Sequence, residues 1–160
     1  MTICTIGYEG LDIQAFLSLL IKHGVRTVVD IRELPLSRKP GFSKRGLSDI
    51  LADSGLDYVH MVQLGCPKEV RDRYKKNGSW KQYTKGFLQY LDEQGDALEE
   101  LAAAAAESRC ALLCFEADYT RCHRSFVADA LHERFDIDVQ HIDVAEAKKG
   151  KPGRPLAAAA

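Results

Sequence analysis

The sequence predicts an α/β protein: a three-layer α/β/α domain with a mainly parallel sheet of about five strands. Three observations predict this class. Short runs of apolar and β-branched residues, typical of buried strands, recur along the chain. Segments with apolar residues at helical spacing separate these runs. The 160 residues, 46% of them hydrophobic and 28% charged, suit one soluble domain with its own core.

The first two strands and the helix between them form the best-defined unit. Residues 2–6 are an apolar run that predicts the first strand. Asp12 can cap a helix whose apolar stripe runs from Ile13 to Ile21. Residues 27–31 are rich in β-branched side chains and predict a second buried strand. Strand, helix and strand at this spacing indicate a βαβ unit with a right-handed crossover.

The alternation continues to residue 142. Pro35, Pro40 and Gly41 predict an irregular loop over residues 32–44, and Ser43 can cap the helix after it. The further strands are expected at 56–61, 111–115 and 139–142. The further helices are expected in three places: a short one from Pro67 within a polar loop, one over 79–91, and one capped by Asp96 that runs through the alanine-rich segment. This order indicates a Rossmann-like arrangement.

One domain over residues 1–144 accounts for these elements, followed by a basic, flexible tail over 145–160. The tail contains the letters PGRP, which resemble a minor-groove hook but have Pro152 where a hook has arginine. The final residues, 156–160, are interpreted as a cloning remnant.

Charge and cysteine content limit the location and the partners. The net charge of −1 gives no overall attraction to nucleic acid or membrane, so a basic site must be local. The sequence shows neither a signal peptide nor an apolar stretch of membrane-spanning length. Five cysteines at irregular spacing favour free thiols in a reducing cytoplasm over a disulfide framework. No cofactor and no resident metal are predicted.

Ligands of open parallel sheets bind beyond the carboxyl ends of the strands. The residues that follow the predicted strand ends should therefore face one crevice. They are Gly7, Tyr8, Glu9 and Gly10 after the first strand; Asp30, Arg32 and Glu33 after the second; His60 after the third; Cys114, Glu116 and residues 122–124 after the fourth; and His141 and Asp143 after the fifth.

The loop after the second strand is basic. It carries the cations Arg32, Arg38, Lys39, Lys44 and Arg45, and Ser43 opens a helix with free backbone N–H groups. Arginine forks beside a helix N-terminus form an anion site, most naturally for phosphate. The alternative is a solvated loop whose charges bind nothing specific.

The segment CFEADYTRCHR holds the candidate reactive groups. Cys122 lies at a predicted helix N-terminus beside His123, which suits a nucleophilic thiolate; alternatively, it packs as a small apolar residue. Glu116 and Asp30 are candidate acid–base carboxylates; alternatively, they orient arginines in buried ion pairs. A metal set of Cys114, Cys122, His123 and His141 matches no standard zinc spacing.

Aromatic residues recur at helical spacing at Trp80, Tyr83, Phe87 and Tyr90. Such a stripe can stack a nucleic-acid base, but we interpret it as part of the core.

Several separated motifs together resemble the domain of unknown function 488 family, over roughly residues 2–143. They are TIGYEG, VVDIRELPLSRKPGFSK, YVHMVQLG, the Trp80–Tyr83 pair and CFEADYTRCHR. The resemblance implies a functional role for the following residues: Gly7, Tyr8, Asp30, Arg32, Pro35, Ser37, Arg38, Phe42, Ser43, Lys44, His60, Leu64, Gly65, Glu116, Cys122, His123 and Arg124. Cys66 departs from the family pattern, which has glycine there. The family supplies no reaction.

A second, weaker resemblance concerns VVDIRELP, which is similar to a strand end of rhodanese-like domains. Those domains also place a cysteine loop between a strand and a helix. The loop lengths differ here, and Ala128 stands where the arginine of a C-x5-R phosphatase loop would be. A sulfurtransferase that uses Cys122 is therefore kept as an alternative.

The preferred hypothesis is a crevice that binds an anionic, phosphorylated ligand, such as a nucleotide or a nucleic-acid end. The expected ligand-binding residues are Tyr8, Arg32, Arg38, Ser43, Lys44, His60 and Arg124, and the candidate catalytic residues are Cys122, His123, Glu116 and Asp30. Another class of function, a non-enzymatic nucleic-acid-binding module, is suggested by the basic loop and tail.

Overall fold

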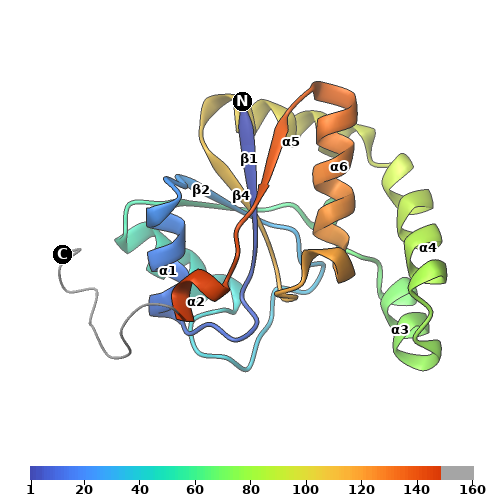
Figure 1. Cartoon of the computed structure of the whole chain (residues 1–160), viewed down its shortest axis with the longest axis horizontal. Helices are drawn as coiled ribbons and strands as arrows, with labels where there is room; N and C mark the ends of the chain where they lie inside the picture. The colour runs from blue at the N-terminus through green and yellow to red at the C-terminus, as the bar shows by residue number, and fades with distance from the viewer. Residues whose placement is uncertain (149–160) are drawn as a thin grey trace.

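A computed structural model describes residues 1–148 and contains one five-stranded sheet in the order β3-β2-β4-β1-β5 (Figure 1). The strands are β1 (Thr2–Gly7), β2 (Thr27–Asp30), β3 (Asp57–His60), β4 (Cys110–Cys114) and β5 (Asp138–His141). Every neighbouring pair is parallel. The predicted fold class is confirmed, and each strand boundary lies within about one residue of its prediction.

Helices cover both faces of the sheet. They are α1 (Ile13–Lys22), α2 (Lys44–Asp53), α3 (Lys68–Asn77), α4 (Trp80–Asp92), α5 (Gly95–Glu107), α6 (His123–Phe135) and α7 (Ala145–Lys148), with the short 3-10 helices η1 (Val62–Leu64) and η2 (Tyr119–Arg121). In Figure 1, α1 lies on one side of the strands, and α6 and α4 lie on the other.

Side chains alternate between two apolar cores because successive strand residues point to opposite faces. Ile3 and Leu112 belong to the core under α4, α5 and α6. Cys4 and Leu113 belong to the core under α1 and α2. The central strand β4 is buried at all five positions, as expected of a parallel strand covered on both faces. This strand therefore provides the most enclosed support for a site at its carboxyl end.

The capping predictions have different outcomes. Asp12 caps α1 as predicted, since its Oδ1 accepts a hydrogen bond of 2.8 Å from the Ala15 N–H. Ser43 precedes α2, but its hydroxyl bonds to the backbone of Ser37 instead of capping the helix. Asp96 lies inside the first turn of α5, where its charge still favours the helix dipole.

The C-terminal boundary extends beyond residue 144. The helix α7 follows at once and packs on α1, with Glu146 accepting a hydrogen bond of 2.7 Å from Lys22. The remainder of the predicted tail, including PGRP and the segment interpreted as a cloning remnant, lies outside the described residues. Within residues 1–148, no helix has both the length and the apolar character needed to span a bilayer.

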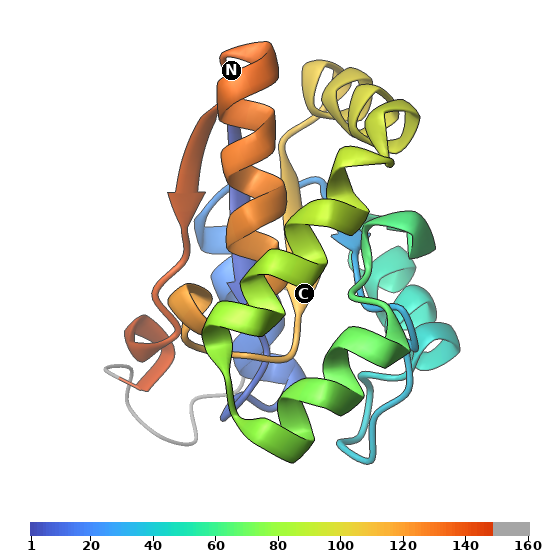
Figure 2. The same ribbon diagram turned by 90° about the vertical axis from the view of Figure 1, so that its right-hand side faces the viewer.

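The pair α3 and α4 lies outside the layer formed by α6, where α4 crosses that helix (Figure 2). The sequence predicts only a short helix within a polar loop here, whereas α3 runs for ten residues. None of its residues is buried, and Val70 and Tyr74 supply its apolar contacts. The aromatic stripe of α4 behaves as predicted: Tyr83 and Phe87 are buried in the core, and Trp80 and Tyr90 pack at its margin.

Candidate active site

A crevice of about 500 Å³ lies where the carboxyl ends of the three inner strands meet. Tyr8 follows β1, Arg32 follows β2 and Cys114 ends β4, and all three line it. Glu116, Cys122 and His123 come from the loop after β4 and the start of α6. The crevice thus collects many of the groups that topology predicts at this edge.

Gly7 allows the loop after β4 to pass directly over the end of β1. A Cβ at this position would collide with the carbonyl of Glu116. The glycine therefore determines how closely the loop that separates Cys114 from Cys122 approaches the sheet. Cys66, the departure from the family pattern, has no positive φ, so its backbone does not need glycine.

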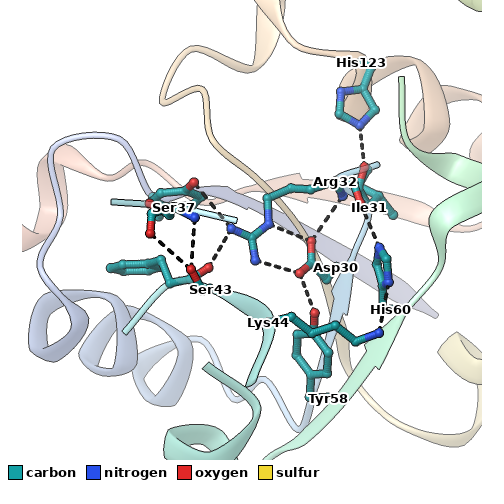
Figure 3. A network of polar contacts seen from close by, with 11 residues as sticks. Asp30, Ile31, Arg32, Ser37, Ser43, Lys44, Tyr58, His60 and His123 are labelled. Atoms are coloured by element: carbon teal, nitrogen blue, oxygen red, sulfur yellow. Dashed lines mark hydrogen bonds and ion pairs between the residues drawn. The ribbon is translucent and has the colours of Figure 1, made fainter. Parts of the chain in front are cut away.

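Cys122 is the N-cap of α6, and its sulfur lies 3.8 Å from Nδ1 of His123. The Nε2 of His123 lies 2.7 Å from the carbonyl oxygen of Ile31 (Figure 3). A carbonyl can only accept, so Nε2 carries the proton and Nδ1 presents a lone pair to Cys122. Burial lowers the pKa of His123 to about 4, so the ring is neutral at pH 7.

The expectation of separate free thiols does not hold for Cys114 and Cys122, whose sulfurs lie in contact although their Cα separation exceeds that of an ordinary disulfide. The structure pairs the sulfur of Cys122 with that of Cys114, and their Cα atoms are 7.7 Å apart. Cys4, Cys66 and Cys110 are free and buried. The pairing has no signature in the irregular cysteine spacing, because it depends on how the loop returns from β4 to α6.

Asp30 and Arg32 form a buried ion pair next to the crevice (Figure 3). Asp30 accepts hydrogen bonds of 2.9 and 2.7 Å from the Arg32 guanidinium and one of 2.5 Å from the Tyr58 hydroxyl. Burial opposes the charge of Arg32, but the hydrogen bonds and charge of Asp30 outweigh it and raise the Arg32 pKa. Asp30 is fully buried and does not line the crevice, so the geometry matches the ion-pair alternative.

Arg124 is also fully buried, but no carboxylate forms an ion pair with it among residues 1–148. Its guanidinium donates to the Cys114 sulfur at 3.0 Å and to the carbonyl oxygens of Glu116 and Ala117. Burial lowers the pKa of Arg124 to about 10. The side chain supports the loop from beneath and does not line the crevice, so it cannot hold an anion there.

The other basic-loop residues also fail to converge with Arg32. Arg38 is exposed and lies outside the crevice lining. Ser43 and Lys44 line a separate, shallower hollow with Arg45 and Tyr58. The structure therefore does not bring the four predicted anion-binding cations into one site; they are Arg32, Arg38, Lys44 and Arg124.

His60 contacts the backbone of Arg32 and the side chain of Lys44, which lines that hollow. Its Nε2 lies 2.8 Å from the carbonyl oxygen of Arg32, and its Nδ1 lies 3.4 Å from Lys44 Nζ (Figure 3). The carbonyl again fixes the protonated nitrogen as Nε2.

Two cations that the sequence did not single out, Arg71 and Lys75 from α3, line the crevice, and so does Arg121 from η2, which lies next to Cys122 in the sequence. Arg71 is paired with Glu33 at 2.6 Å. Lys75 and Arg121 form no ion pair among the described residues, and the Arg121 guanidinium lies 5.6 Å from the Trp80 ring centroid. Recognising α3 as a full helix would have placed two of these residues here.

Glu116 is half-buried in the crevice wall. Burial, with the nearby charge of Glu9, raises its pKa. A carboxyl with a raised pKa keeps its proton to a higher pH than an ordinary glutamate does, and it can donate that proton to a leaving group.

No group of three or more His, Cys, Asp or Glu side chains in residues 1–148 is arranged to hold a metal ion. His141, part of the alternative metal set, bonds to Thr5 at 2.7 Å and stacks on Tyr119.

A family model, Domain of unknown function DUF488, matches residues 12–131. The chain belongs to this family. The match spans β2, β3, β4 and most of α6, so it contains both paired cysteines and every crevice-lining residue except Tyr8. No curated protein and no solved structure matches the chain.

Proposed function

We propose that this DUF488 protein is an enzyme whose Cys122 attacks a small anionic substrate bound in the crevice. The observation that carries the proposal is the contact between the Cys122 sulfur and Nδ1 of His123. The Ile31 carbonyl holds the opposite ring nitrogen as an N–H donor. His123 is therefore oriented to accept the proton of the thiol.

The position of Cys122 at the start of α6 supports the same role. The first-turn N–H groups of a helix place partial positive charge beside the cap residue. That charge favours a thiolate over a thiol. By contrast, burial raises the pKa of Cys66, the third cysteine in the crevice wall, to about 11.

The anionic character of the substrate is inferred from the crevice charges. Glu33 neutralises Arg71 and Asp30 neutralises Arg32. The remaining cations of the lining, Lys75 and Arg121, outnumber its remaining carboxyl, Glu116, and can attract a negative group. A phosphate or carboxylate suits both cations. The rings of Tyr8, Tyr74 and Tyr83 line the same space and favour a substrate with a planar or apolar part.

The test is alkylation of the reduced protein with iodoacetate, which is anionic, and iodoacetamide, which is neutral. We expect Cys122 to label faster than a free thiol, and inorganic phosphate to slow the labelling. His123→Gln retains a donor toward Ile31 and removes the basic nitrogen; it should slow both reagents about 100-fold. Peptide mapping by mass spectrometry measures each rate.

Charge variants separate substrate attraction from thiol activation. Lys75→Gln combined with Arg121→Gln should slow iodoacetate about 10-fold and leave iodoacetamide unchanged. Arg38→Gln is the matched control, since this exposed arginine lies outside the crevice. Labelling no faster than a free thiol, or wild-type rates in His123→Gln, would refute the proposal.

A further inference from the structure

We infer that Cys114 is a second reactive thiol and that the substrate class is a small disulfide carrying negative charge. The inference rests on the proposed function, because it requires Cys122 as the first nucleophile. It adds a partner thiol, a reaction type and a chemical class of substrate.

Two different elements bring the thiols together. Cys114 is the last residue of the central strand β4, and Cys122 caps α6 eight residues later. Both lie in the crevice wall with their sulfurs paired. Two thiols in contact at a ligand site can exchange one disulfide bond between them and a bound molecule.

Arg124 provides the independent observation for Cys114. This fully buried cation has no carboxylate ion pair in residues 1–148, and its Nη1 donates to the Cys114 sulfur at 3.0 Å. Its other hydrogen bonds go to neutral acceptors, namely the Thr5 hydroxyl and two carbonyls. The charges of Glu116 and Asp118 act on Arg124 without a direct ion pair, and a thiolate at Cys114 would supply a negative charge in hydrogen-bond contact with the guanidinium.

A different side chain contacts each of the two sulfurs. His123 is placed to take a proton from Cys122, and Arg124 is placed to stabilise an anion on Cys114. Cys122 is suited to attack first. Cys114 is suited to attack second and, when the pair is reduced, to leave as a stabilised thiolate.

The reaction balances in two steps. The Cys122 thiol loses its proton, which Nδ1 of His123 relays to water, and its sulfur attacks one sulfur of R–S–S–R. The substrate S–S bond breaks, RS⁻ leaves, and a Cys122–S–S–R mixed disulfide forms. The Cys114 thiolate then attacks the Cys122 sulfur, the second RS⁻ leaves, and a Cys114–Cys122 disulfide remains. The protein thiols lose two electrons and the substrate gains them. An external thiol restores the dithiol by the reverse exchange.

The experiment uses the reduced protein and dithiobis(nitrobenzoate), an aromatic disulfide with carboxylates. We expect release of about two thiolate equivalents per chain, no aryl adduct by mass, and a mapped Cys114–Cys122 cross-link. Cys114→Ser should release about one equivalent and retain the adduct on Cys122. Cys110→Ser is the matched control, because Cys110 is a free, buried cysteine outside the crevice lining, and it should behave like the wild type.

The outcomes separate the two proposals. A wild-type protein that releases one equivalent and keeps an aryl group on Cys122 overturns the role of Cys114 while preserving Cys122 as the nucleophile. Failure of Cys122 to react overturns both. The wild-type measurement alone decides between these results, so the conclusion does not depend on the folding of Cys114→Ser.

Discussion

Two fully or largely buried arginines lie at the same edge of the sheet, and their partners differ. Arg32 is matched by Asp30 through two hydrogen bonds, and the pair is internally neutral. Arg124 is surrounded by carbonyls, a hydroxyl and the Cys114 sulfur. The ion pair of Asp30 and Arg32 therefore has a structural role, because both charges are already compensated. The Arg124 guanidinium has no direct carboxylate partner in residues 1–148, and a thiolate at Cys114 would contact it. We therefore assign the proposed thiol chemistry to this second cluster.

The largest effect should come from breaking the matched pair. Asp30→Asn leaves the Arg32 charge buried without its anion, and we expect the free energy of unfolding to fall by about 3–5 kcal/mol. Adding Arg32→Met removes the orphaned charge and should recover part of the loss. Urea denaturation of the single and double variants measures both values. A double variant less stable than Asp30→Asn would contradict the description of this cluster as a matched pair.

The second effect is a loss of stability at acid pH. It comes from His123, which lies beside Cys122. The folded-state pKa of His123, about 4, lies below its ordinary value of 6.5, so the unfolded chain binds a proton first as pH falls. The contribution of neutral His123 to stability is complete above about pH 6.5 and declines toward pH 4, by about 3 kcal/mol in total.

His123→Gln isolates this contribution because it cannot titrate in that range. We expect the stability difference between the wild type and His123→Gln to shrink as pH falls from about 7 to 4. Chemical denaturation at several pH values measures the difference. A difference that stays constant with pH would show that His123 has the same pKa in the folded and the unfolded protein.

The smallest of the three effects tests the loop over Gly7. Gly7→Ala places a methyl group against the Glu116 carbonyl, which is also an acceptor for Arg124. We expect a loss of about 1–3 kcal/mol and a slower reaction of Cys122, since the loop and both sulfurs must shift.

Gly95→Ala is the control for that substitution, because nothing lies within 4 Å of its added Cβ. It should leave stability and thiol reactivity unchanged. Equal behaviour of the two variants would mean that the close approach at Gly7 has no influence on the thiol cluster.

The fold could be predicted from the sequence because its signals are local. Apolar and β-branched runs marked every strand, and the edge where the strand ends meet followed from the parallel order. Cys122 and His123 were singled out because they begin a helix directly after a strand and loop. These inferences need only the spacing of residue types along the chain.

The remaining site features depend on tertiary packing. Charge density in the loop suggested that Arg38 and Lys44 act with Arg32, but the direction of an exposed side chain is not encoded in its neighbours. Arg124 follows Cys122 by two residues and points beneath the loop instead of into the crevice. Lys75 was missed because α3 lacks the buried stripe that predicts a helix.

That absence of a buried stripe in α3 has a consequence for how the substrate preference of this protein can be changed. This helix supplies Arg71, Tyr74 and Lys75 to the crevice but no residue to the interior. Substitution of the exposed Lys75 can change ligand preference at little cost in folding free energy, because exposed positions tolerate change. The proposed reactive sulfurs, by contrast, are positioned by the central strand and α6. In the proposed enzyme, the residues that select the substrate and the residues that react with it therefore lie on separate segments.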